Sequence, residues 1–103
     1  MNSRQLHRWF HQINKDIFNG ELPTPRITAV SLPQEYLGFC DEKSNGKYEL
    51  IVSDAYMDGM QLSTLAHEMI HLWQFENGLT TSHGKEFKQW AKLFKVHYGW
   101  LVL

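Results

Sequence analysis

The amino-acid sequence predicts an α+β fold: an N-terminal helix, a small and mostly antiparallel sheet of about three strands, and then two helices. Three observations support this class. Apolar residues recur every three or four positions in residues 3–18 and again after residue 58, which is the period of a helix with one buried face. The segment between them holds short β-branched runs and an Asn-Gly pair. The 103 residues suffice for one modest core, so we expect a single domain over residues 1–103.

The first helix is predicted over residues 3–18. Its apolar face is formed by Leu6, Trp9, Phe10, Ile13, Ile17 and Phe18. Asn2 and Gln5 have the spacing of a capping box, and Gly20 is a natural helix stop. Pro23 and Pro25 then exclude helix and predict an extended connector.

Three strands are predicted over residues 26–32, 36–41 and 48–53. The last two flank Asn45-Gly46, and Asn-Gly is the strongest short-range signal for a hairpin. These strands are expected to form the small, largely antiparallel sheet.

The second helix is predicted to begin near Asp58, with Gln61 at the capping-box distance, and to end near Asn77 before Gly78. It is apolar around much of its circumference, which predicts that it is buried. The third helix is predicted over residues 83–97, with a core stripe that includes Phe87 and Phe94.

The composition narrows the class of protein. A net charge of -1 does not favour general attraction to nucleic acid or membranes. Cys40 is the only cysteine, so neither an internal disulfide nor a Cys-rich zinc ribbon can form. The first twenty residues do not resemble a secretory signal, and the longest apolar run, Trp100 to Leu103, is too short to cross a bilayer. We expect a cytoplasmic or nucleoid- or nucleus-associated protein that is not secreted and has no membrane partner.

A candidate metal site lies within the second predicted helix, in the segment His67-Glu68-Met69-Ile70-His71. Two histidines four residues apart share one helical face and can present two nitrogens to one metal ion. Glu68 is rotated about 100° from His67 and need not bind the metal. It can instead act as a general base toward a metal-bound water, as in zinc peptidases with the HExxH motif.

A catalytic zinc site needs a third protein ligand and one open position. His83, twelve residues after His71, is the leading candidate for this ligand, and Glu86 is the alternative. The extended metzincin pattern is excluded, because Gln74 and Asn77 stand where it requires Gly and His.

Four segments in order resemble the SprT-like metallopeptidase family, which includes the Spartan proteases. They are Phe18-Asn19-Gly20-Glu21-Leu22-Pro23, then Gly38 followed by Ile51-Val52-Ser53, then His67-Glu68-Met69-Ile70-His71, and last His83-Gly84-Lys85-Glu86-Phe87. The resemblance covers nearly the whole chain and is confined to the peptidase core, without the zinc ribbon of many members. It implies one Zn²⁺ held by His67, His71 and His83, with Glu68 as catalytic base. Family members tied to the repair of DNA–protein crosslinks depend on DNA contact.

The leading hypothesis is therefore a zinc-dependent endopeptidase that acts on protein or peptide substrates, including DNA-associated proteins. Tyr36 and Tyr48 are the available candidates for stabilising the oxyanion. The alternative is a metal-stabilised DNA- or protein-binding module with little or no proteolysis. Glu68 argues against it, because a structural zinc site usually fills its fourth position with a protein ligand.

A candidate nucleic-acid face lies on the third predicted helix. Lys85, Lys88, Lys92 and Lys95 are spaced 3, 4 and 3 residues apart and so share one side. Such a stripe can contact phosphates and would support weak, salt-sensitive DNA binding, or it can be a solvated helix face. His7 and His11 also lie four apart, but Arg8 occupies the place of the base and no third ligand is evident. These two residues, like His97, are expected to be surface residues.

Overall fold

The computed structural model describes all residues, 1–103, and confirms the predicted fold class. The elements follow the order α1 (Ser3–Phe18), β1 (Arg26–Val30), β2 (Gly38–Glu42), β3 (Tyr48–Ser53), α2 (Asp58–Glu76) and α3 (Lys85–His97).

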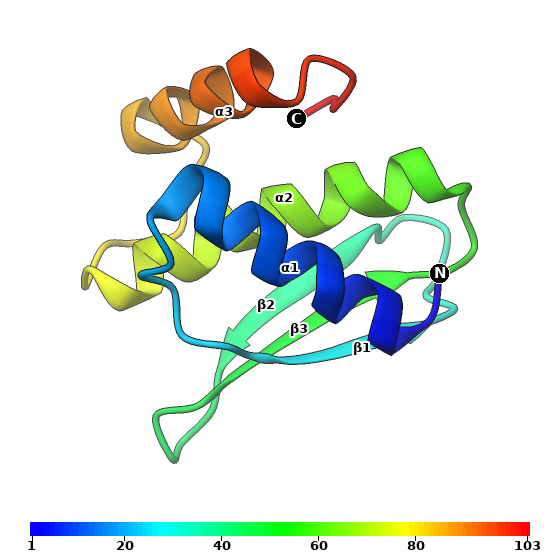
Figure 1. Cartoon of the computed structure of the whole chain (residues 1–103). Helices are drawn as coiled ribbons and strands as arrows, with labels where there is room; N and C mark the ends of the chain where they lie inside the picture. The colour runs from blue at the N-terminus through cyan, green and yellow to red at the C-terminus, as the bar shows by residue number, and fades with distance from the viewer.

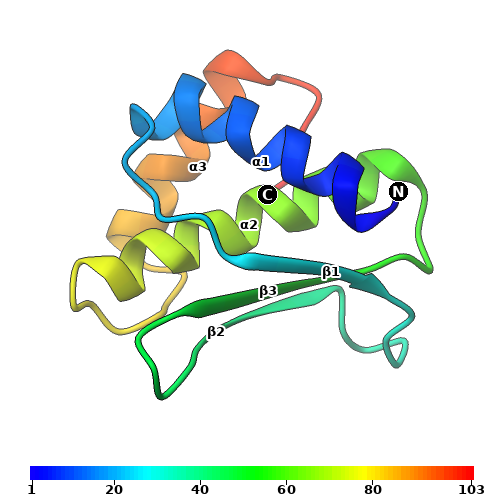
Figure 2. The same ribbon diagram turned by 60° about the horizontal axis from the view of Figure 1, so that its bottom comes forward.

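The elements are stacked in layers (Figures 1 and 2). α1 and α2 lie side by side on one face of the sheet, with α1 over β1 and α2 over β2 and β3. α3 packs on α1 and α2 away from the sheet, whose other face carries no helix. The core lies between the sheet and the helices, and α2 runs through its centre, with most of its side chains buried.

The sheet is mixed, with the strand order β1-β3-β2. The β2–β3 hairpin is antiparallel, as predicted, and Gly46 at its turn has a φ of +77°. The β1–β3 pair is parallel, which corrects the expectation of a mostly antiparallel sheet. The physical reason is the loop between β1 and β2, which reverses the direction of the chain but leaves room for one strand between them. β3 occupies this place, antiparallel to β2 and therefore parallel to β1. β1 also ends at Val30, short of the predicted residue 32, and β2 begins at Gly38 rather than residue 36.

α1 has the predicted bounds and the predicted capping box between Asn2 and Gln5. It ends at Phe18, and the next two residues, Asn19 and Gly20, both have positive φ. The buried Asn14 holds the extended segment that follows α1 in place. Its side-chain amide donates a hydrogen bond to the carbonyl of Leu22 and accepts one from the N–H of the same residue.

The predicted capping box at the start of α2 is wrong. Met57 is the N-cap, and no side chain caps the helix. Gln61 instead donates from its side chain to the carbonyl of Tyr56 and accepts a hydrogen bond from the N-terminal amine of Met1. Gly78 follows the helix with a φ of +67°, as predicted for a stop. None of the three helices has the length and apolar character that a membrane span requires.

α3 begins at Lys85, two residues later than predicted. The preceding segment is held by other bonds: Gly84 N–H donates to Ser82 Oγ, and the backbone of Ser82 is bonded to the side chain of Gln74 on α2. His83 therefore lies in the loop between α2 and α3 and not within a helix.

Candidate metal centre

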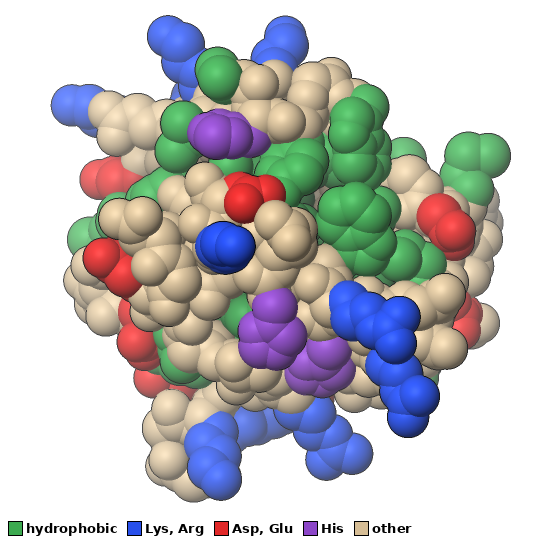
Figure 3. Space-filling view, viewed as in Figure 1, with side chains coloured by type: hydrophobic (Ala, Val, Ile, Leu, Met, Phe, Trp, Pro, Cys, Tyr) green, Lys and Arg blue, Asp and Glu red, His purple; other side chains and the backbone are tan.

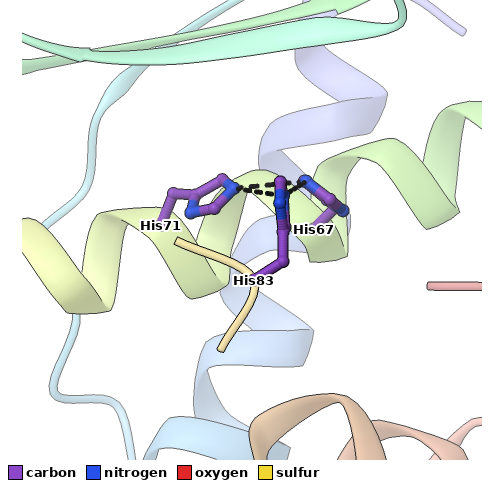
Figure 4. Close-up of side chains that lie close together, drawn as sticks. All are labelled: His67, His71 and His83. Carbon is purple, nitrogen blue, oxygen red and sulfur yellow. Dashed lines mark hydrogen bonds between the residues drawn. The ribbon is translucent and has the colours of Figure 1, made fainter. Parts of the chain in front are cut away.

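Three imidazole rings meet at the surface of α2 (Figure 4). His67 and His71 project from adjacent turns of α2, and His83 reaches them from the loop that precedes α3. The Nε2 atoms are separated by 3.2 Å between His67 and His71, 3.3 Å between His71 and His83, and 3.1 Å between His67 and His83. They form a nearly equilateral triangle, and these three residues could hold one metal ion.

The hydrogen bonds of Gln74 identify which nitrogen of His71 carries the proton. Ser82 N–H donates to Gln74 Oε1 at 3.3 Å, so this oxygen is an acceptor. His71 Nδ1 lies 2.8 Å from the same oxygen and must therefore donate to it. In the neutral ring Nε2 then has no proton, and its lone pair points toward the other two histidines. A cation is the natural partner for lone pairs that converge in this way.

Burial keeps His67 and His71 in the neutral form that binds metals. It lowers the pKa of His67 to about 4, with smaller contributions from His71 and His83. Burial also lowers the pKa of His71, although the hydrogen bond to Gln74 acts in the opposite direction. The ring of Phe87 contributes to this apolar environment, because its centroid lies 4.8, 5.3 and 4.9 Å from those of His67, His71 and His83. At neutral pH, protons therefore compete little with a metal ion at His67 and His71.

Glu68 lies next to His67 on the side of α2 that faces β2. Only 8% of the residue is exposed, and its carboxylate forms no ion pair. Burial, and to a lesser degree the nearby charge of Asp41, raises the pKa of Glu68 to about 7. A carboxyl group with this pKa can both accept and release a proton near neutral pH.

A pocket of about 430 Å³ opens beside His67 and Glu68. Its apolar lining consists of Tyr36, Leu37, Met60, Val102 and Leu103. The C-terminal residues are held there by a hydrogen bond of 3.0 Å from Val102 N–H to Ser63 Oγ. The pocket thus places an apolar surface next to a carboxylate and an imidazole.

In a comparison with known protein families, residues 6–100 match the SprT-like family. The chain belongs to the SprT-like family. The match covers the whole of β1 to α3 and α1 from Leu6 onward. The comparison with curated proteins gives no match. Membership agrees with the fold and with a three-histidine metal site, as the resemblance of the sequence implied.

The other candidate ligands and oxyanion-binding residues of this SprT-like chain lie outside the cluster of three histidines. Glu86 is exposed on α3 and lies outside the cluster of possible ligands. Tyr36 lines the pocket that contains Glu68, whereas Tyr48 donates to Glu76 near the far end of α2 at 2.6 Å. The rings of His7 and His11 stack with centroids 6.4 Å apart, and no third ligand joins them.

The four lysines of the candidate nucleic-acid face are all exposed, and none forms an ion pair. Lys88, Lys92 and Lys95 border a shallow pocket of about 510 Å³ that also includes Gly99 and Leu101. Figure 3 shows basic side chains that project outward at the top of the molecule, where Figure 1 places α3.

Sequence reasoning overlooked the role of Gln74 in this SprT-like site. In the sequence Gln74 stands out only as a departure from the metzincin pattern, yet its side chain forms hydrogen bonds with both His71 and Ser82. The available signal was its position three residues after His71, which places both side chains on one helical face.

Proposed function

We propose that the protein is a zinc-dependent endopeptidase in which His67, His71 and His83 hold one Zn²⁺ and Glu68 is the general base. The observation that carries this proposal is the triangle of Nε2 atoms, with sides of 3.1 to 3.3 Å, beside a buried carboxylate. Two nitrogens bound to one zinc ion at about 2.0–2.1 Å, at tetrahedral angles, lie about 3.3–3.4 Å apart. The imidazoles therefore suit zinc closely, and three protein ligands leave one position open.

The chemistry is divided between the metal and the chain. When bound, zinc acts as a Lewis acid that polarises the peptide carbonyl and activates water. Glu68 takes a proton from the attacking water and returns it to the amine that leaves when the peptide bond breaks. Its pKa of about 7 suits both transfers. Tyr36 is the remaining candidate for an additional contact to the oxyanion, because it lines the pocket beside Glu68.

The pocket supports a peptide substrate. It adjoins His67 and Glu68, and its exposed Leu37 and Met60 offer an apolar surface. The side chain of a residue next to the cleaved bond can bind there, while the peptide group lies at the metal centre. An open apolar pocket beside a carboxylate is typical of a site that binds a ligand, and a purely structural metal site does not require one.

The test compares three forms of the protein. Glu68→Gln should retain one zinc per chain and lose hydrolysis of fluorescein-labelled casein, since only the base is removed. His67→Ala should lose both the zinc and the hydrolysis. Wild-type protein that contains no stoichiometric zinc after purification in its presence would refute the metal assignment. Undiminished hydrolysis by Glu68→Gln would refute the assigned base.

The exposed lysines of α3 favour a second candidate function, weak DNA binding. The protein would then act on DNA-associated proteins in the nucleoid or nucleus, or serve as a metal-stabilised binding module with little proteolysis. A band shift with single-stranded DNA that survives Glu68→Gln and is lost in Lys88→Ala/Lys92→Ala would support this function. No shift at low salt, where phosphate contacts are strongest, would exclude it. DNA binding without hydrolysis would favour the module.

A further inference from the structure

We propose that Gln74 is a positioning residue that joins the two halves of the metal site. This inference rests on the proposed zinc site, and it adds a residue that does not itself contact the metal. One half of the site is α2, which carries His67 and His71. The other half is the loop that carries His83, twelve residues further along the chain. The loop is largely exposed, so a contact with α2 close to His83 is required to hold this residue near the other two histidines.

Gln74 provides this connection from within α2. It is 1% exposed, and every polar atom of its side chain is used. Oε1 accepts hydrogen bonds from His71 Nδ1 at 2.8 Å and from Ser82 N–H at 3.3 Å. Nε2 donates to the carbonyl of Ser82 at 3.1 Å. The amide of Gln74 thus contacts the ring of His71 and the backbone of Ser82, the residue directly before His83.

The two contacts have different effects on the metal site. The bond to His71 holds the proton on Nδ1 and sets the plane of the ring, which directs the unprotonated Nε2 toward the metal position. The pair of bonds to Ser82 satisfies both backbone groups of that residue and fixes the chain where His83 begins. Only a side chain with an acceptor and a donor on one planar group can do both, and a glutamine amide has this form.

Loss of Gln74 should therefore weaken the metal site more than the fold. In Gln74→Met, an unbranched apolar side chain of similar size fills the same space within α2. Without the amide, His71 is free to turn and Ser82 bonds to water, so His83 is no longer held near the other two rings. Removal of such a supporting group typically lowers metal affinity by about 10- to 100-fold.

Gln61 offers a matched control on the same helix. It is 2% exposed, and its side chain also bonds backbone groups, at Tyr56 and at the N-terminus. Gln61→Met thus makes the same chemical change at the same depth, away from the histidines. Zinc affinity would be measured for wild type and both variants by competition with a chromophoric chelator. Thermal unfolding of the metal-free proteins would be recorded in parallel.

We expect Gln74→Met to bind zinc about 10- to 100-fold more weakly than wild type, and Gln61→Met to bind it with wild-type affinity. The visible absorption of the Co²⁺-loaded protein should also change in Gln74→Met alone, because that spectrum reports the geometry of the ligands. Gln74→Glu keeps the acceptor for His71 but has no donor for the Ser82 carbonyl, so its affinity should fall between wild type and Gln74→Met.

Wild-type zinc affinity in a folded Gln74→Met would overturn the inference. Equal losses of affinity in Gln74→Met and Gln61→Met would also overturn it, since they would indicate a general effect of buried amides. Gln74→Glu that binds no better than Gln74→Met would remove the assigned role of the His71 bond. The proposed function fails separately: a wild type that binds zinc tightly but hydrolyses no protein would contradict the peptidase and leave the role of Gln74 intact.

Discussion

Gly38 of β2 and Thr64 of α2 approach so closely that a Cβ atom on residue 38 would lie 2.7 Å from Thr64 Cγ2. The same atom would lie 2.5 Å from the backbone oxygen of Ile51 on β3. Glycine at this position allows α2 to pack closely against the sheet at Thr64, one helical turn before Glu68. The contact therefore sets the wall of the pocket relative to the helix that carries the proposed catalytic groups.

Gly38→Ala should destabilise the fold, because the added methyl group meets backbone that cannot move aside easily. Overpacking of this kind typically costs about 1–3 kcal/mol, and urea unfolding monitored by tryptophan fluorescence would measure it. Gly59→Ala is the matched control. Gly59 lies in the first turn of α2 with nothing within 4 Å of an added Cβ, so this variant should be neutral or slightly stabilised. Equal stability of the two variants would contradict the close approach.

Removal of metal from the proposed site should lower the thermal stability of the protein, because the three histidines are brought together only in the folded chain. A ligand that binds the folded state alone stabilises it by about 2.7 kcal/mol at one hundred times its dissociation constant. Differential scanning calorimetry with zinc and after treatment with EDTA would measure the shift in Tm.

The zinc-dependent shift in Tm should disappear in His83→Ala and persist in His97→Ala. His97 is an exposed histidine at the end of α3 and does not belong to the cluster. A full shift in His83→Ala would show that zinc acts elsewhere on the protein.

Cys40 should be unusually slow to react with alkylating reagents. Burial, together with repulsion from Glu68 and Asp41, raises the pKa of its thiol to about 12, compared with about 8.5 for an unperturbed cysteine. A raised pKa means less reactive thiolate at any pH below the folded value. At pH 8 alkylation by iodoacetamide should therefore be more than about 100-fold slower in the folded protein than in guanidinium. The rate should rise as the pH approaches 12. Equal rates in the folded and denatured states would show that the thiol is accessible and unperturbed.

The pocket beside Glu68 should favour substrates with an apolar residue next to the cleaved bond. Met60→Gln changes the lining from apolar to polar with little change in size, and should lower kcat/KM for such peptides by roughly 10-fold. Met57→Gln provides the control, because Met57 is exposed close by and does not line the pocket. Fluorogenic peptides that differ at one position would measure both variants. The same kcat/KM for apolar and polar peptides would rule out this role of the pocket.

Local signals predicted the elements well. The Asn2–Gln5 box, the Asn45-Gly46 turn and the stop at Gly78 each depend on residues within a few positions of one another, and each occurs in the structure. The histidines of α2 could be placed together for the same reason, since helical spacing alone sets their common face. The convergence of His83 on this face agrees with the sequence expectation.

Distant partners were harder to foresee. The parallel pairing of β1 with β3 depends on which strand fills the gap in the sheet, and no local pattern specifies that. The spacing from Asp58 predicts a capping role for Gln61, but its side chain bonds the N-terminal amine and the Tyr56 carbonyl instead. Gln74 acquires its role only when the loop after α2 folds back on it.

β2 has a hydrogen-bonded partner on one side only, because it lies at the edge of the sheet. Edge strands open at a lower free-energy cost than central elements such as α2. Glu68 and the two proposed metal ligands on α2, His67 and His71, thus belong to the rigid part of the molecule, whereas Leu37, just before the edge strand, lies in a part that can move more easily. The pocket could then take up substrate side chains of different size without displacing the proposed catalytic groups. Amide hydrogen exchange should accordingly be faster in β2 than in α2.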